Sequence, residues 1–259
     1  MTPIGDRLRG AAAILADLDG TLIFGNRPAS GAAELLRQAG ERLAVVSNYS
    51  IMDATEMADW LGRMGLVLPP ERIFLAGELA IHRVSQESPG ARVLCLMTAP
   101  MRRFAVERGL VLADDDVDVV LIGRDLDFTY QRLAAAMRAV HAGARIVATN
   151  LDRSHPGAEG LAVPETGALV AAVTAASPGI AVEIVGKPQP HLFRQALAAL
   201  GAPSHLAIML GDNPETDGAG ARAAGIPAIL IGRGAGADVA DLASLVASSF
   251  SPHLQDHNS

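Results

Sequence analysis

Short apolar runs alternate with helical stretches along the chain, and this alternation restricts the fold more than any other feature. Helical spacing of apolar residues favours helices over 30–40, 53–65, 129–143 and 190–201, with Asp53 placed as an N-cap. Nine runs have the length and composition of buried strands: 12–18, 42–47, 72–76, 92–97, 117–123, 145–149, 181–186, 206–211 and 227–232. Strand–helix alternation with near-continuous apolar strands predicts an α/β fold built on a mainly parallel sheet.

The composition excludes several classes of partner. Half of the 259 residues are apolar, 19% are charged, and the formal net charge is −7, which argues against a nucleic acid polymer as the partner. No run approaches the ~20 apolar residues that a membrane span needs, so we expect no membrane partner. A single cysteine, Cys95, and an N-terminus without a signal-peptide pattern lead us to expect a cytoplasmic protein.

Polar side chains follow four of the predicted strands at the point where each strand ends. In an open parallel sheet, ligands bind beyond the carboxyl ends of the strands. We therefore expect these groups to form one catalytic rim: Asp17 and Asp19, Ser47 and Asn48, Lys187, and Asp212 with Asp217 five residues later.

The residue types in this rim suit phosphoryl transfer. An aspartate such as Asp17 can act as a nucleophile, and attack on a phosphate dianion needs a divalent cation to offset charge repulsion. Mg²⁺ prefers oxygen ligands, of which Asp17 and Asp212 would supply two. Asp19, two residues on, is suited to protonate the leaving oxygen and then to activate water. Ser47 and Lys187 can donate hydrogen bonds to the phosphoryl oxygens.

Each of these residues, taken alone, also has an ordinary structural interpretation. An isolated Asp-x-Asp is usually a turn or a cap, and Ser47–Asn48 alone would be a turn. Asp212 and Asp217 suit a helix N-terminus, and Lys187 before Pro188 suits a solvated helix start. Only the ordered set of four motifs makes a catalytic interpretation specific.

The four motifs resemble those of a known superfamily. "DLDGT" (17–21), "SN" (47–48), "GKP" (186–188) and "GDNPETD" (211–217) match, in order, the motifs of the haloacid dehalogenase (HAD) superfamily of phosphatases. The long insertion between the second and third motifs resembles class IIA, the NagD-like and p-nitrophenylphosphatase-like branch. The resemblance implies a Rossmann-like parallel-sheet core with an inserted α/β cap of the C2 type. We place the core at 1–76 and 181–259, and the cap at 77–180.

The resemblance also implies a role for each matching residue. Asp17 is implied as the nucleophile and Asp19 as the acid/base. Mg²⁺ ligation is implied for Asp17, Asp212 and the main-chain carbonyl of Asp19, with Asp217 as an outer partner. Phosphate binding is implied for Ser47, Asn48 and Lys187.

The cap is expected to choose the substrate. "ATNLDRSHP" (148–156) resembles the substrate-specificity loop of this branch, which singles out Asn150, Asp152 and His155. For His155 an ordinary exposed loop histidine is an equal alternative. The next segment, "GAEGLAVPETG" (157–167), is individual to this chain, and we expect substrate identity to depend on it.

The function predicted from the sequence is a Mg²⁺-dependent hydrolase of a small phosphorylated metabolite that works through an aspartyl-phosphate. Two alternatives stay open at this point. A phosphomutase or phosphotransferase would use the same core and return the phosphoryl group to a sugar. A non-catalytic phosphate-binding module is disfavoured by the intact pair Asp17 and Asp19. Caps of this type can dimerise, so a homodimer is compatible with the resemblance.

Overall fold

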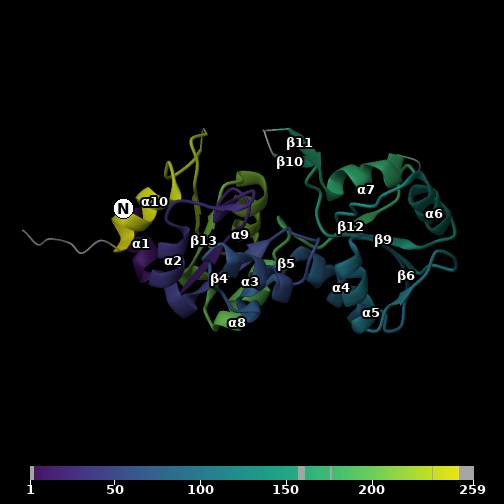
Figure 1. The fold of residues 1–259 in the computed structure, drawn as a ribbon, viewed down its shortest axis with the longest axis horizontal. Helices are drawn as coiled ribbons and strands as arrows, with labels where there is room; N and C mark the ends of the chain where they lie inside the picture. The colour runs from purple at the N-terminus through teal and green to yellow at the C-terminus, as the bar shows by residue number, and fades with distance from the viewer. Residues whose placement is uncertain (1–2, 157–160, 176, 235, 251–259) are drawn as a thin grey trace, which may run out of the picture.

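The chain folds into two α/β bodies that lie side by side along the long axis of the molecule (Figure 1). The computed structural model describes residues 3–156, 161–175, 177–234 and 236–250. Each body contains a five-stranded sheet in which all paired strands are parallel, with strand orders β14-β13-β1-β4-β5 and β12-β9-β8-β6-β7. The predicted α/β fold is therefore confirmed.

The first sheet is covered on both faces by helices. Its strands are β1 (Ala13–Ala16), β4 (Leu43–Ser47), β5 (Ile73–Leu75), β13 (Ala207–Gly211) and β14 (Ala228–Leu230). Alternate strand residues, such as Ile14 and Leu15, enter two different apolar clusters on opposite faces. One face packs against α1 (Ile4–Gly10), α2 (Ala32–Ala39), α3 (Ala54–Arg63) and α10 (Leu242–Phe250), and the other against α8 (His191–Leu200) and α9 (Ala219–Ala223). Burial on both faces explains why these strands are apolar throughout.

The second sheet is covered in the same way. Its strands are β6 (Arg92–Leu96), β7 (Val111–Leu112), β8 (Val119–Ile122), β9 (Arg145–Ala148) and β12 (Val182–Ile184). One face packs against α4 (Ala76–Glu87) and α5 (Ala99–Glu107), and the other against α6 (Tyr130–His141) and α7 (Thr166–Ala175). Two antiparallel hairpins stand apart from the sheets: β2 (Ile23–Phe24) with β3 (Arg27–Pro28), and β10 (Ser154–Pro156) with β11 (Ala162–Pro164).

One strand belongs to a different sheet from the one we expected. The 181–186 run was assigned to the core, but β12 pairs with β9 of the second sheet, with Val182 opposite Ile146. The sequence pattern of a buried parallel strand is the same in both sheets, so it does not say which sheet the strand joins. We therefore propose to keep the first domain boundary at 76/77 and to move the second from 180/181 to 184/185.

The structure also bears on the expectation of a protein outside the membrane. In the parts of the chain that the structure describes, no helix is both long enough and apolar enough to cross a lipid bilayer.

The N-cap residue of helix α3 gives a test of the local structure. Asp53 precedes the helix in extended conformation, and its Oδ1 accepts a hydrogen bond from Glu56 N at 2.9 Å. We expect Asp53→Ala to lower the free energy of unfolding by about 1 kcal/mol, because a helix N–H loses its acceptor. Urea unfolding followed by circular dichroism measures this change. Asp59→Ala, at an exposed position inside the same helix, is the control and should change stability by less than about 0.5 kcal/mol. Equal effects of the two variants would contradict the capping role.

Candidate active site

Three neighbouring strands of the first sheet deliver polar residues to one edge. Asp17 directly follows β1, Ser47 is the last residue of β4, and Asp212 directly follows β13. The sheet order β13-β1-β4 places these strands next to one another, and all three are parallel. Their carboxyl ends therefore meet, as the sequence predicted for these three positions.

Lys187 reaches the same place from the second sheet. It lies on the connection from β12 to α8, and its Nζ contacts Asp17 Oδ1 at 2.5 Å and Asp217 Oδ1 at 2.6 Å. All three side chains are buried. Burial opposes the charged ammonium, but the two carboxylates outweigh it and raise the pKa of Lys187. Lys187 is therefore a permanent positive charge between two acids.

The carboxylates at this edge form a set suited to a hard cation. Oxygens of Asp17, Asp212 and Asp217 lie within 4.8 Å of one another. Burial raises the pKa of Asp17 well above its ordinary value, against the lowering effect of Lys187, and loss of solvation followed by the Asp217 charge raises the pKa of Asp212. One lysine does not neutralise three acids. An oxygen-only donor set with excess negative charge fits Mg²⁺.

A glycine allows this approach. Gly20 has a φ of +84°, in the left-handed region, and a Cβ at this position would overlap the Asp212 carboxylate. The "DGT" part of the first motif therefore has a steric reason: the chain must turn closely past the third acid of the cluster.

Asp19 lies at the open side of the cluster. Its side chain is exposed, yet the surrounding protein reduces its solvation and raises the pKa of its carboxyl. The charges of His155, Lys187 and Arg124 act in the opposite direction and lower this pKa. A carboxyl group with a raised pKa in an open position suits an acid that exchanges protons with substrate and water.

Asn48 joins the two bodies. Its Oδ1 accepts from Lys187 N at 2.7 Å, and its Nδ2 donates to Asp152 Oδ2 at 3.0 Å. Its backbone carbonyl accepts from Asn150 Nδ2 at 2.9 Å. A Cβ at Gly186 would overlap Asn48 Oδ1, so this contact depends on a glycine.

These bonds bear on two of the predicted specificity residues. The hydrogen bonds of Asn150 and Asp152 are directed to Asn48 of the first body. We therefore propose that Asn150 and Asp152 position the second body on the first, and that their effect on the substrate is indirect.

Two charged residues that contact each other in the second body were not among the predicted site residues. Arg124 follows β8, and Glu165 follows β11. Glu165 Oε1 lies 3.1 Å from Arg124 Nη1 and 2.7 Å from His155 Nδ1. Arg124 meets the criterion that identified Asp17 and Asp212 in the sequence, because it is a polar residue just beyond a buried strand. Glu165 falls within the individual segment 157–167, of which 157–160 lie outside the described residues.

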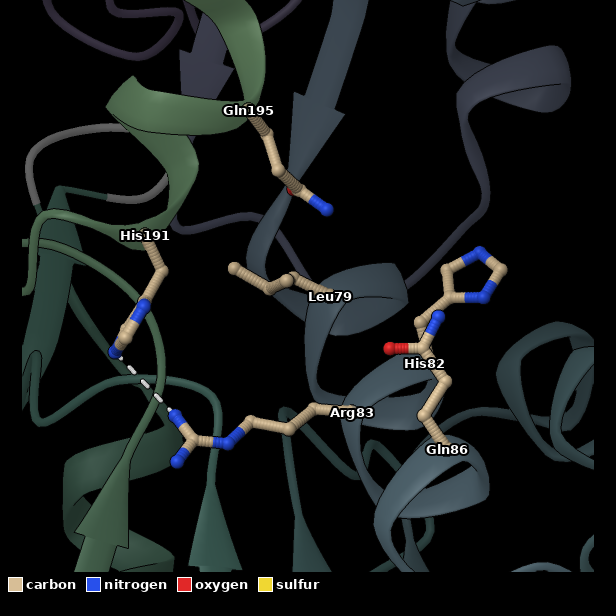
Figure 2. A pocket seen from close by; sticks show the side chains of 6 residues that line it. All are labelled: Leu79, His82, Arg83, Gln86, His191 and Gln195. Carbon is tan, nitrogen blue, oxygen red and sulfur yellow. Dashed lines mark hydrogen bonds between the residues drawn. The ribbon is translucent and has the colours of Figure 1, made fainter. Parts of the chain in front are cut away.

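A separate hollow of about 370 Å³ lies between α4 and α8. Figure 2 shows its lining side chains, among which Arg83 Nη1 contacts His191 Nε2 at 3.3 Å. Arg83 also pairs with Glu183 at 2.8 Å. The carboxylates of the cluster do not line this hollow, so it is distinct from the candidate active site.

An edge of carboxylates with one buried lysine suits chemistry on phosphate esters, and comparison with known proteins supports this interpretation. The model of the haloacid dehalogenase-like hydrolases matches residues 11–225. An acid sugar phosphatase of Staphylococcus saprophyticus is 33% identical over 214 residues, which cover 81% of this chain and 82% of that protein.

Two solved structures are similar over most of the chain. The glycerol phosphate phosphatase of Mycobacterium tuberculosis in complex with magnesium has a TM-score of 0.83 at 31% identity, covering 93% of this chain and 78% of that one. The 4-nitrophenylphosphatase of Thermotoga maritima has a TM-score of 0.84 at 25% identity, covering 94% and 99%.

This chain belongs to the haloacid dehalogenase-like hydrolase family, and the resemblance drawn from its four motifs is confirmed. Within the family it is a phosphatase.

Proposed function

We propose that the chain is a Mg²⁺-dependent phosphomonoester hydrolase that acts on a small phosphorylated metabolite through an aspartyl-phosphate on Asp17. The observation that carries this proposal is the buried contact of Lys187 with Asp17 and Asp217, beside the exposed Asp212. The relatives add support, because they are named for an acid sugar and for glycerol phosphate, and one is solved with magnesium. We also propose a cytoplasmic location and leave a homodimer as a prediction.

Each residue of the candidate active site has a role that follows from its position. Asp17, Asp212 and the main-chain carbonyl of Asp19 would hold Mg²⁺, with Asp217 as an outer partner, and the ion supplies positive charge to the phosphoryl oxygens when bound. Lys187 adds a fixed ammonium, and Ser47 adds a hydroxyl at the end of β4. These donors are in place before the substrate arrives, so they need little reorganisation as negative charge develops.

The reaction then proceeds in two displacements. A carboxylate oxygen of Asp17 attacks phosphorus, the ester P–O bond breaks, and Asp19 gives its proton to the leaving oxygen. In the second step Asp19, now ionised, takes a proton from water, the water oxygen attacks phosphorus, and the bond to Asp17 breaks. Inorganic phosphate leaves, and both carboxyl groups return to their first state.

Metal removal tests the acidic cluster by two readouts. We expect EDTA to stop hydrolysis of p-nitrophenyl phosphate and Mg²⁺ to restore it. We also expect Mg²⁺ to raise the thermal midpoint, because a cation that binds only the folded chain stabilises it by about 2.7 kcal/mol at 100 times its Kd. Asp212→Asn should lose both effects, whereas Asp59→Asn, exposed on α3, should keep both. Full activity in EDTA with no midpoint shift would exclude the metal assignment.

Replacing Asp17 and replacing Asp19 should affect the hydrolysis of different esters to different extents. Asp17→Asn removes the nucleophile and should abolish turnover of every ester. Asp19→Asn removes the proton donor, so it should slow alkyl phosphates more than p-nitrophenyl phosphate, whose leaving group needs little protonation. Steady-state release of inorganic phosphate measures both variants and also separates hydrolysis from transfer to a sugar. A loss by the same factor on all esters in both variants would contradict the separate roles.

A further inference from the structure

We propose that Arg124, Glu165 and His155 form the leaving-group site of this enzyme, and that the site selects a neutral, hydroxyl-bearing leaving group over an anionic one. This inference rests on the proposed function, because it assigns the part of the substrate that the first body does not hold. We call these three residues the cap triad.

The cap triad is a connected unit on the second body. Glu165 Oε1 contacts both of the other residues, Arg124 Nη1 at 3.1 Å and His155 Nδ1 at 2.7 Å. The three residues come from different segments: Arg124 follows β8, His155 lies in β10, and Glu165 follows β11. A bond from Glu165 N to Arg153 O, 3.0 Å long, holds the base of the hairpin beside this glutamate.

Hydrogen bonds tie the segments that carry Arg124 and His155 to the loop that follows β4. Arg124 N donates to Ser50 Oγ at 3.0 Å, so its backbone touches the loop that follows Ser47 and Asn48. Asp152, three residues before His155, accepts from Asn48 Nδ2 at 3.0 Å, which holds the segment that carries His155 against the same loop. We therefore place the leaving group of the substrate beside the triad.

Exposure of the triad suits contact with a small ligand. The side chains of Arg124, Glu165 and His155 are 19%, 17% and 33% exposed. They are buried enough to strengthen the contacts among them, and open enough to be reached by a ligand. Loss of solvation raises the pKa of Glu165, and the Arg124 and His155 charges act against this rise.

The charge balance favours hydroxyls over a second anion. Arg124 and His155 already share one glutamate oxygen. A carboxylate on the leaving group would have to displace Glu165 from Arg124 and lie beside the displaced glutamate. A hydroxyl both donates and accepts, so it can bind between the Glu165 carboxylate and the Arg124 guanidinium without a change in charge.

The test compares three esters that differ only in the leaving group: glycerol 3-phosphate, propyl phosphate, which lacks the hydroxyls, and 3-phosphoglycerate, which carries a carboxylate. In the wild-type enzyme we expect kcat/KM to be highest for glycerol 3-phosphate. Glu165→Gln should lower kcat/KM for glycerol 3-phosphate by about tenfold to a hundredfold, with less than a twofold change for propyl phosphate. The same variant should raise kcat/KM for 3-phosphoglycerate relative to glycerol 3-phosphate, because one opposing charge is gone.

Two further variants complete the test. Arg124→Gln should also lose activity selectively on glycerol 3-phosphate, and it provides the answer if Glu165→Gln does not fold. Glu183→Gln is the matched control, because it breaks another glutamate–arginine pair, with Arg83 at 2.8 Å, and Arg83 lines the separate hollow shown in Figure 2. It should leave all three kcat/KM values within twofold.

The outcomes separate this inference from the proposed function. A wild-type preference for 3-phosphoglycerate, or an equal loss on glycerol 3-phosphate and propyl phosphate in the triad variants, would overturn the inference while hydrolysis itself stands. Failure of the wild-type enzyme with Mg²⁺ to hydrolyse any of the esters or p-nitrophenyl phosphate would overturn the proposed function.

Discussion

The contact of one buried ammonium with two buried carboxylates is the interaction on which the rest of this structure depends. Lys187 lies between Asp17 and Asp217, at 2.5 and 2.6 Å. Removing one partner from such a group would leave an uncompensated buried charge, at a cost of about 3–5 kcal/mol. The lysine arrives from the second sheet, whereas Asp17 and Asp217 belong to the first body. The catalytic edge is therefore complete only when the chain has folded through both bodies.

Through Asn48, the position of the second body, the predicted cap, also depends on the contacts around Lys187. The same side chain accepts from the backbone of Lys187 and donates to Asp152, so the position of the cap is tied to the residue beside the nucleophile. The hydrogen bonds also hold the segments that carry Arg124 and His155 against the loop that follows β4, where we propose that the substrate is chosen.

Much of this arrangement could be predicted from the sequence, because the signals are local. Asp17, Ser47 and Asp212 each end an apolar run, and parallel strands bring their carboxyl ends to one edge. The N-cap at Asp53 was also predictable, since its acceptor and the helix N–H are three residues apart.

The rest depends on packing between distant segments. The sheet that β12 joins was predicted incorrectly, because a strand of three residues carries too little pattern to tell one parallel sheet from the other. Arg124 and Glu165 are 41 positions apart in the sequence, and only the folding of the second body brings their charges together. An arginine after a strand is an ordinary surface feature until its partner is known.

The central claim is that Asp17 carries the phosphoryl group during turnover. The Asp19→Asn variant, in which hydrolysis of the intermediate should be slowed, can be mixed with Mg²⁺ and p-nitrophenyl phosphate, quenched in acid and digested. Mass spectrometry of the peptide that contains β1 then measures the modification. The account predicts one added phosphoryl group on Asp17, removed by hydroxylamine and absent from Asp17→Asn. Rapid release of p-nitrophenol with an unmodified Asp17, or with the phosphoryl group on another residue, would contradict it.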